Sequence, residues 1–329
     1  MLFQNAKHPV EMKVTHLNKV KAQRKQQLQL QMVNDKGLTS LISRAFTDLT
    51  KKETTKKTSK FGLFKNKAAN KNCFVLDFHG DIKATEVQQL REEISTLLTV
   101  AQAEDEVIVR LESSGGMVHA YGLAAAQLAR IKEAGLHLTV CIDKVAASGG
   151  YMMACVADKI LAAPFAVVGS IGVVAQVPNF HDLLEKHDID VEVFTAGKYK
   201  RTVTVFGENT EEDKQKFQQE LEETHKLFKD FVRKYRPSLD VEQVATGEHW
   251  YGEDAITRNL VDALQTSDSY ILEKMTDNEL YVIQSRQKPT IAQKLGISQA
   301  AQAVVATAID KLPDALAKLE SAKMPMVKK

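Results

Sequence analysis

The sequence predicts an α/β fold with a largely parallel sheet. Apolar, β-branched runs alternate with amphipathic segments from residue 73 to residue 162, and this alternation is typical of strand–helix–strand units with right-handed crossovers. Glycine-bearing turns follow two of the predicted strands, at 113–116 and 148–150. Ligands of parallel sheets bind beyond the carboxyl ends of the strands. We therefore expect both turns to meet at one cleft.

The first half of this domain is predicted to contain four strands and two helices. The apolar segments predicted as strands are 73–78, 107–112, 137–142 and 159–162. Apolar residues recur at helical spacing across 84–102, which predicts an amphipathic helix. A second helix at 121–134 is expected to end at Gly135, because glycine readily adopts the left-handed conformation that closes a helix.

The second half is more varied. The predicted elements are a bent, glycine-punctuated strand at 168–174, a helix near 179–187, a strand at 191–195 and a turn, helix and short strand within 246–262. Residues 209–213 are a helix-start signature of the capping-box type, so a long helix is expected to begin there. Pro237 should end that helix near Arg236.

Charge divides the chain into three predicted parts. Residues 1–72 hold 16 Lys and Arg against 4 Asp and Glu, whereas the remaining residues hold 28 against 38. We interpret 1–72 as a basic, poorly ordered arm that contacts anionic lipid headgroups, binds nucleic acid or serves as a solvated linker; of these partners, nucleic acid is the one we do not expect. Residues 73–285 form the predicted enzyme domain. The Ala-rich segment 286–329 is predicted to be a helical tail, which packs on a neighbouring subunit or frays.

Several classes of site are disfavoured by residue spacing. Cys73, Cys141 and Cys155 lie in apolar segments without a CxxC pair, so they are expected to be small core residues. The nine histidines show no metal-ligand spacing, and neither a metal nor a cofactor is predicted. No run of about 18 apolar residues is present to predict a membrane span.

Ser148 is the strongest candidate nucleophile. It lies between the strand 137–142 and a small apolar helix, where unpaired amides and the helix dipole favour a developing negative charge. Gly149 and Gly150 would let a substrate backbone approach closely. The alternative is that Ser148 merely caps the helix, as serine commonly does.

A serine nucleophile requires a base, and the sequence leaves two kinds open. His119 and His249 have no evident carboxylate partner, although a triad assembles from any chain order. A lysine serves when burial disfavours its ammonium form. Lys144, Lys198 and Lys200 are the candidates, and spacing does not choose among them.

Several motifs together resemble the signal peptide peptidase A family of serine peptidases. In chain order these are Ser-Gly-Gly at 114–116, Ala-Ala-Ser-Gly-Gly-Tyr at 146–151, Val-Gly-Ser-Ile-Gly-Val at 168–173 and Tyr-Lys-Arg-Thr at 199–202. The resemblance covers roughly residues 73–285. It implies a ClpP/crotonase-like fold of repeated ββα units, a homo-oligomer and a location at the bacterial inner membrane.

The resemblance also implies a Ser-Lys dyad that hydrolyses short or unfolded peptides, such as cleaved signal peptides. Ser148 matches the nucleophile and Lys200 the general base, and Ser170 matches a serine that orients the lysine. The oxyanion hole and its support match Gly115, Gly116 and Gly149.

The chain departs from the family pattern in two places. Relatives usually have proline where this chain has Ser114, which loosens the turn. They also usually carry an N-terminal membrane anchor, so either the anchor is missing from this chain or the basic arm replaces it. Two other functions stay open: a crotonase-type enzyme acting on acyl-CoA, and a non-catalytic membrane-associated scaffold.

Overall fold

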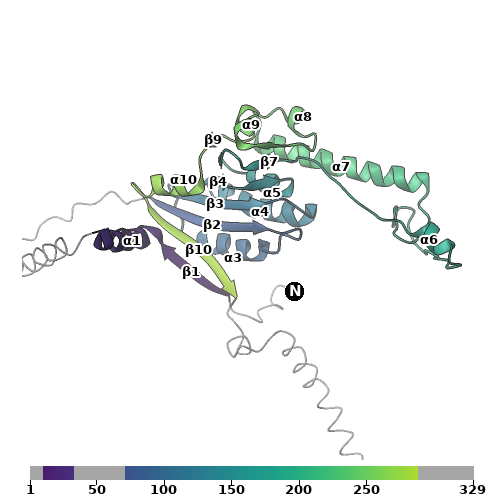
Figure 1. Cartoon of the computed structure of the whole chain (residues 1–329), viewed down its shortest axis with the longest axis horizontal. Helices are drawn as coiled ribbons and strands as arrows, with labels where there is room; N and C mark the ends of the chain where they lie inside the picture. The colour runs from purple at the N-terminus through teal and green to yellow at the C-terminus, as the bar shows by residue number, and fades with distance from the viewer. Residues whose placement is uncertain (1–9, 33–70, 288–329) are drawn as a thin grey trace, which may run out of the picture. The chain divides into compact units, whose positions relative to one another are not determined.

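The computed structural model describes residues 10–32 and 71–287, and the described residues between 12 and 285 form one compact unit. Its main sheet has the strand order β1-β10-β2-β3-β4-β6-β9. These strands are β1 Val10–His16, β10 Glu279–Gln287, β2 Asn72–Gly80, β3 Glu106–Ser113, β4 His137–Ile142, β6 Lys159–Ala162 and β9 Ala263–Leu264. Neighbours from β10 through β9 pair in parallel. The predicted largely parallel sheet is therefore confirmed (Figure 1).

A short second layer of strands branches from β3. The strands are β5 Val145–Ala147, β7 Val167–Gly169 and β8 His249–Tyr251. Strand β5 pairs with Ser113 at the end of β3 and with β7, and β8 pairs antiparallel to β7. Strands β4 and β5 and helix α5 Gly149–Ala154 form one ββα unit on the parallel sheet. This architecture is the ClpP/crotonase-like arrangement that the sequence implied.

Alternation along β2 shows how the sheet separates two cores. Phe74, Leu76 and Phe78 point into the larger core with the buried faces of α3 Val87–Leu97 and α4 Val118–Glu133. Cys73 and Val75 point into a smaller core closed by α10 Ser267–Lys274. All three cysteines are buried and free, as predicted. Burial raises the pKa of Cys73 and of Cys141 to about 12, so these thiols stay protonated.

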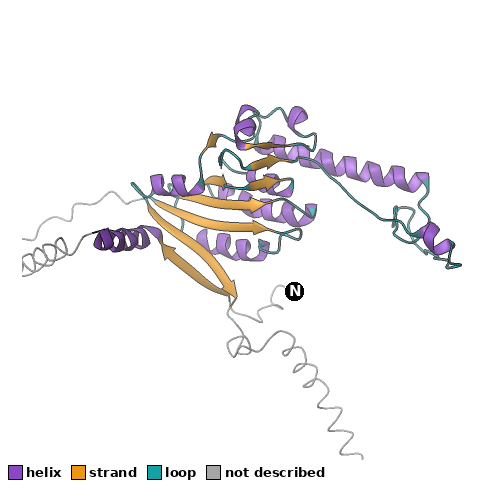
Figure 2. Ribbon diagram, viewed as in Figure 1, coloured by secondary structure: helices purple, strands orange, loops and turns teal. Residues whose placement is uncertain are grey.

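The long helix α7 Glu211–Tyr235 begins as the sequence predicts. Thr210 accepts a hydrogen bond from the Asp213 amide, and the Asp213 carboxylate accepts one in return from the Thr210 amide. Only the second half of the helix is packed: Phe228 and Val232 are its buried residues. The first half extends away from the sheet, and α6 His181–Glu185 lies near its far end (Figures 1 and 2).

Arg236, just after α7, attaches this helix to the core. Its guanidinium donates to both Asp262 oxygens at 2.9 and 2.7 Å and to the Asn259 carbonyl at 2.9 Å. Two further short helices, α8 Val241–Val244 and α9 Gly252–Thr257, complete this region. These hydrogen bonds from the buried Arg236 guanidinium therefore fix the C-terminal end of α7 against the core.

Three sequence-based expectations differ from the structure. The strand expected at 168–174 is shorter, because β7 ends at Gly169. Residues 191–195 form no strand and are exposed, because no neighbouring strand lies beside them to accept their hydrogen bonds. Residues 10–32 were assigned to a poorly ordered arm, but β1 joins the sheet beside β10 and α1 Leu17–Met32 follows it. Helix α1 nevertheless buries none of its residues.

Other expectations lie outside the described residues. These are the Lys-rich part of the arm at 33–70 and the Ala-rich tail at 288–329. Within the described part of the chain, no helix combines the length and the hydropathy needed to cross a bilayer.

We predict that Arg236→Ala lowers the free energy of unfolding by about 1.5–3 kcal/mol, because it removes a buried guanidinium and its hydrogen bonds to the partly exposed Asp262 carboxylate. Chemical denaturation measures this. Arg233→Ala is the matched control: its ion pairs with Asp230 and Glu242 are solvent-exposed, so its loss should cost about 1 kcal/mol or less. Equal costs for the two variants would contradict the anchoring role of Arg236.

Candidate active site

A cleft of about 870 Å³ opens where β3, β5 and β7 end. Both predicted glycine turns contribute to it, so their expected convergence is confirmed. Its lining residues are Ile82, Ser114, Gly115, Gly116, Met117, Val118, Ser148, Ser170, Gly172, Val173, Val174, His225, Thr246 and Gly247.

Ser148 occupies a strained turn at the entry to α5. Its φ of 51° lies in the left-handed region that non-glycine residues rarely adopt. Its amide donates to the Gly169 carbonyl at 2.8 Å, which holds the turn in place. The Ser148 side chain makes no capping hydrogen bond to α5. The helix-cap interpretation is therefore not supported, and the hydroxyl is available to the cleft.

Ser170 is placed beside Ser148 by strand register. Ala147 pairs with Gly169, so the two serines leave neighbouring parallel strands at the same level. Ser170 also has a φ of 51°, and its amide donates to the Glu248 carbonyl at 2.6 Å. Both hydroxyls thus line one cleft, as the sequence-based assignment requires.

The first glycine turn contains an unused amide beside the cleft. The Gly115 amide donates to Ser113 Oγ at 3.0 Å and the Met117 amide donates to the Ile82 carbonyl at 2.9 Å. Among the described residues, the Gly116 amide between them has no hydrogen-bond partner. Gly116 is therefore a better oxyanion donor than Gly115, whose amide is already engaged.

The second unused amide belongs to Gly149, the first residue of α5, where helical amides lack an intrahelical partner. The two turns are in direct contact. A Cβ on Gly115 would lie 2.7 Å from the Gly149 nitrogen and 2.8 Å from Ser148 Cβ. The two turns thus bring together the kinds of group that acyl transfer uses, backbone amides and a serine hydroxyl.

None of the three candidate lysines lines this cleft. Lys144 bonds both Glu112 oxygens, at 3.0 and 2.9 Å. Lys198 contacts Tyr199 and Glu212, and these interactions raise its pKa, which is the wrong direction for a base. Lys200 lies in the exposed segment between α6 and α7. That segment lies near the N-terminal end of α7, away from the sheet (Figure 1).

The histidine in the cleft is His225, which the sequence reasoning missed. His119 and His249 are exposed and do not line the cleft. His225 does, and its buried Nε2 has no hydrogen-bond partner. The available signal was its spacing, since His225, Phe228 and Val232 share one face of α7.

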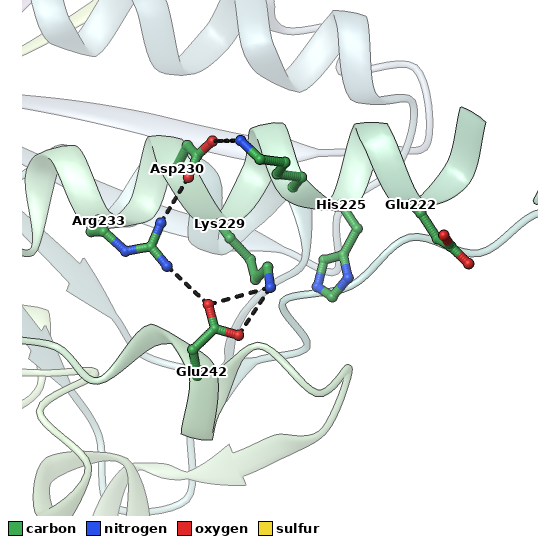
Figure 3. A pocket seen from close by; sticks show the side chains of 7 residues that line it. Glu222, His225, Lys229, Asp230, Arg233 and Glu242 are labelled. Atoms are coloured by element: carbon green, nitrogen blue, oxygen red, sulfur yellow. Dashed lines mark hydrogen bonds and ion pairs between the residues drawn. The ribbon is translucent and has the colours of Figure 1, made fainter. Parts of the chain in front are cut away.

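His225 also borders a second cavity of about 370 Å³ between α7 and α8 (Figure 3). The charged side chains there are largely paired with one another. Lys229 and Arg233 of α7 both bond Glu242 of α8, and Asp230 accepts from Lys226 and Arg233. This network attaches α8 to α7 and leaves little unpaired charge for a ligand.

One group of described side chains has metal-ligand spacing. His181, Asp182 and Glu185 of α6 have ligand atoms within 4.8 Å of one another. They do not line the Ser148 cleft. The cleft itself is lined by hydroxyls, amides, apolar groups and His225.

Comparison with known proteins identifies strong similarities. The model of peptidase family S49 matches residues 130–281, and the model of its N-terminal region matches residues 2–128. The chain is 65% identical over 223 residues to the "Probable protease SohB" of Haemophilus influenzae, covering 68% of this chain and 63% of that protein. It is 56% identical over 205 residues to the "Probable protease SohB" of Buchnera aphidicola subsp. Schlechtendalia chinensis, covering 62% and 67%.

Among solved structures, the 1510-N membrane-bound stomatin-specific protease in complex with a substrate peptide matches with a TM-score of 0.41 and 13% identity. The match covers 70% of this chain and 97% of that chain.

We predict that Gly115→Ala disrupts the cleft, because the added Cβ would meet the backbone of Gly149 and the side chain of Ser148. Labelling of Ser148 by a fluorophosphonate should fall about 10²–10³-fold, because displacing the Gly149 amide is equivalent to losing an oxyanion donor. Gly135→Ala is the control for backbone strain: Gly135 has a similar positive φ but no atom within 4 Å of an added Cβ. It should cost about 1–2 kcal/mol of stability and keep the labelling. Unchanged labelling of Gly115→Ala would contradict the assigned contact.

Proposed function

Because this chain belongs to peptidase family S49, we propose that it is a serine endopeptidase in which Ser148 is the nucleophile and Lys200 the general base. The observation that carries the proposal is the Ser148 turn. The Ser148 backbone is strained and its side chain makes no capping hydrogen bond, and the Gly116 and Gly149 amides of the two turns that meet there have no partner among the described residues. The chain spans 63% of the Haemophilus relative, so its activity is inferred from this site.

The geometry supports a two-step acyl transfer. Ser148 Oγ forms a bond to the substrate carbonyl carbon while its proton passes to the neutral Lys200 amine. The carbonyl oxygen becomes an oxyanion that accepts hydrogen bonds from Gly116 and Gly149. The C–N bond then breaks, and the lysine returns the proton to the leaving amine. Water hydrolyses the acyl-enzyme by the same steps.

We propose that Lys200 reaches this cleft from a second copy of the chain. Its segment is exposed, and among the described residues Lys200 forms no ion pair. Phe194, in the same segment, is 88% exposed, and a second copy that covered it would remove this apolar surface from water. An amine buried among apolar groups loses part of its preference for the charged form. Oligomerisation would thus both deliver the base and prepare it for proton transfer.

The cleft favours apolar, extended peptides as substrates. Ile82, Met117, Val118 and Val174 line it and are exposed, which offers contact area for apolar side chains. Cleaved signal peptides have this character and are produced at a membrane. The basic arm would keep the enzyme near anionic lipid of the bacterial inner membrane, each basic residue contributing about 1 kcal/mol.

Two alternatives fit less well. A crotonase-type enzyme needs an acidic residue beside the thioester, and neither Asp nor Glu is among the residues that line the cleft. A purely structural scaffold has no use for the strain at Ser148 and Ser170.

We predict that Ser148→Ala abolishes both fluorophosphonate labelling and hydrolysis of an apolar fluorogenic peptide. The fold should persist, because the Ser148 side chain makes no capping hydrogen bond. Circular dichroism and thermal unfolding check the fold. Turnover by the purified variant above about 1% of the wild-type rate would be incompatible with a nucleophilic role, given the roughly 10⁶-fold loss typical of such variants.

We predict that Lys200→Arg is as inactive as Lys200→Ala, because a guanidinium keeps its proton at any working pH. Mixing Ser148→Ala with Lys200→Ala, each inactive alone, should restore part of the activity, since some cleft sites would then pair an intact serine with a lysine from the other copy. His225→Gln is the control and should retain its activity. Inactive His225→Gln together with active Lys200→Arg would instead identify a histidine base.

A further inference from the structure

We propose that Tyr121 and Ser113 are positioning residues that hold the oxyanion-binding turn in register with Ser148. This inference rests on the proposed peptidase function. It concerns a hydrogen-bonded chain beneath the cleft, running from Gly115 through Ser113 and Tyr121 to Asp81. None of the sequence motifs singled out Tyr121, which lies on α4.

The direction of each hydrogen bond in this chain is determined. The Tyr121 hydroxyl donates its one proton to the Asp81 carbonyl at 2.8 Å. It must therefore accept from Ser113 Oγ, which lies 2.5 Å away. Ser113 Oγ in turn accepts from the Gly115 amide at 3.0 Å. Each donor has one acceptor, so these hydrogen bonds have a single arrangement.

Because Tyr121 and Ser113 are buried, these hydrogen bonds are the main way in which their hydroxyl groups can be satisfied. Tyr121 is 0% exposed and Ser113 is 2% exposed, so water is not at hand to replace a lost partner. Burial also raises the pKa of Tyr121, which keeps the phenol protonated and able to donate. A break at any one link leaves a buried polar group unsatisfied.

Tyr121 also contacts the second amide donor. A Cβ on Gly149 would lie 2.4 Å from Tyr121 Cγ, so the ring packs directly against the Gly149 backbone. The Ser113 carbonyl similarly crowds Gly150, where a Cβ would lie 2.4 Å from its oxygen. One side chain therefore touches α5 through its ring and supports the glycine turn through its hydroxyl. It sets the spacing between the two amides that would bind the oxyanion.

The turn needs such support because its own residues supply little stiffness. Gly115 and Gly116 are consecutive glycines, which have the greatest backbone freedom to lose. The position before them is Ser114, which is exposed and has no fixed φ of the kind a proline would impose. The Gly116 amide is instead held from both sides, by the hydrogen bonds of Gly115 and Met117.

The test compares Tyr121→Phe and Ser113→Ala with the wild-type chain in peptide hydrolysis. Each variant should lower kcat by about tenfold, less than the 10²–10³ loss expected when an oxyanion donor is removed outright. KM should change less than about twofold, because the apolar cleft is untouched. The kcat of the double variant should be no lower than that of the poorer single variant, since both substitutions break the same series of hydrogen bonds.

A peptide aldehyde provides a second readout that isolates the oxyanion. Ser148 Oγ bonds to the aldehyde carbon, its proton passes to the base, and the carbonyl π electrons become a lone pair on the oxyanion. The inhibition constant of the aldehyde should therefore rise about tenfold in both variants, by the same factor as kcat falls. A role confined to stability would not produce this parallel.

Tyr151→Phe is the matched control. Tyr151 is also 0% exposed, and its hydroxyl donates to a backbone carbonyl, that of Leu260, at 2.9 Å. It should lower the melting temperature about as much as Tyr121→Phe while keeping the wild-type kcat and aldehyde affinity. Thermal unfolding of all variants separates the two effects.

The outcomes distinguish the inference from the function beneath it. An inactive wild-type chain, or an active Ser148→Ala, would overturn the peptidase proposal. An active wild-type chain with wild-type kcat and aldehyde affinity in Tyr121→Phe would overturn the positioning role alone. Additive losses in the double variant would do so as well. If Tyr121→Phe fails to fold, Ser113→Ala decides by the same two measurements.

Discussion

The hydrogen bond from the Ser148 amide to the Gly169 carbonyl fixes the turn from which the site is built. It continues the pairing of β5 with β7, so a regular strand register extends into an irregular turn. Gly169 accepts this bond at a φ of 105°, with the Trp250 ring where a side chain would otherwise be. Because the Ser148 amide is used in this way, the next amide, that of Gly149, is the first one free at the start of α5. The geometry of the candidate oxyanion site follows from this pairing.

The sequence pattern was sufficient to predict the elements whose formation depends on neighbouring residues. The four buried strands, the capping box at Thr210 and the left-handed Gly135 each depend on residues close in sequence. Strand β5 has three residues, too short for a periodic signal. The strand expected at 168–174 forms only as β7, which ends at Gly169. The pairing of β1 with β10 joins opposite ends of the chain. Such contacts depend on tertiary packing, which propensity does not report.

This dependence on tertiary packing also explains why some residues of the site could be predicted from the sequence and others could not. Ser148, Ser170 and the glycine turns end strands of one sheet, and parallel topology brings such ends together. Lys200 lies on a segment outside the sheet, so neither strand order nor spacing determines what its amine contacts. His225 enters the cleft only because Arg236 and the buried end of α7 set the direction of that helix. Its position could be read only after the anchor of the helix was known.

Several strained backbone positions lie around the cleft. Ser148 and Ser170 have positive φ values without being glycine, and Gly115, Gly169 and Gly247 are positive there too. Conformations of this kind cost about 1–3 kcal/mol each in non-glycine residues, and they persist only where the surroundings enforce them. Here the enforcing groups are identifiable: the Gly169 and Glu248 carbonyls hold the two serine amides, and buried Tyr121 and Ser113 lie under the turn. A fold that needed these residues only for stability would gain by relaxing them. Their retention in one water-accessible cleft, beside two unpartnered amides, is the physical basis for assigning catalysis to it.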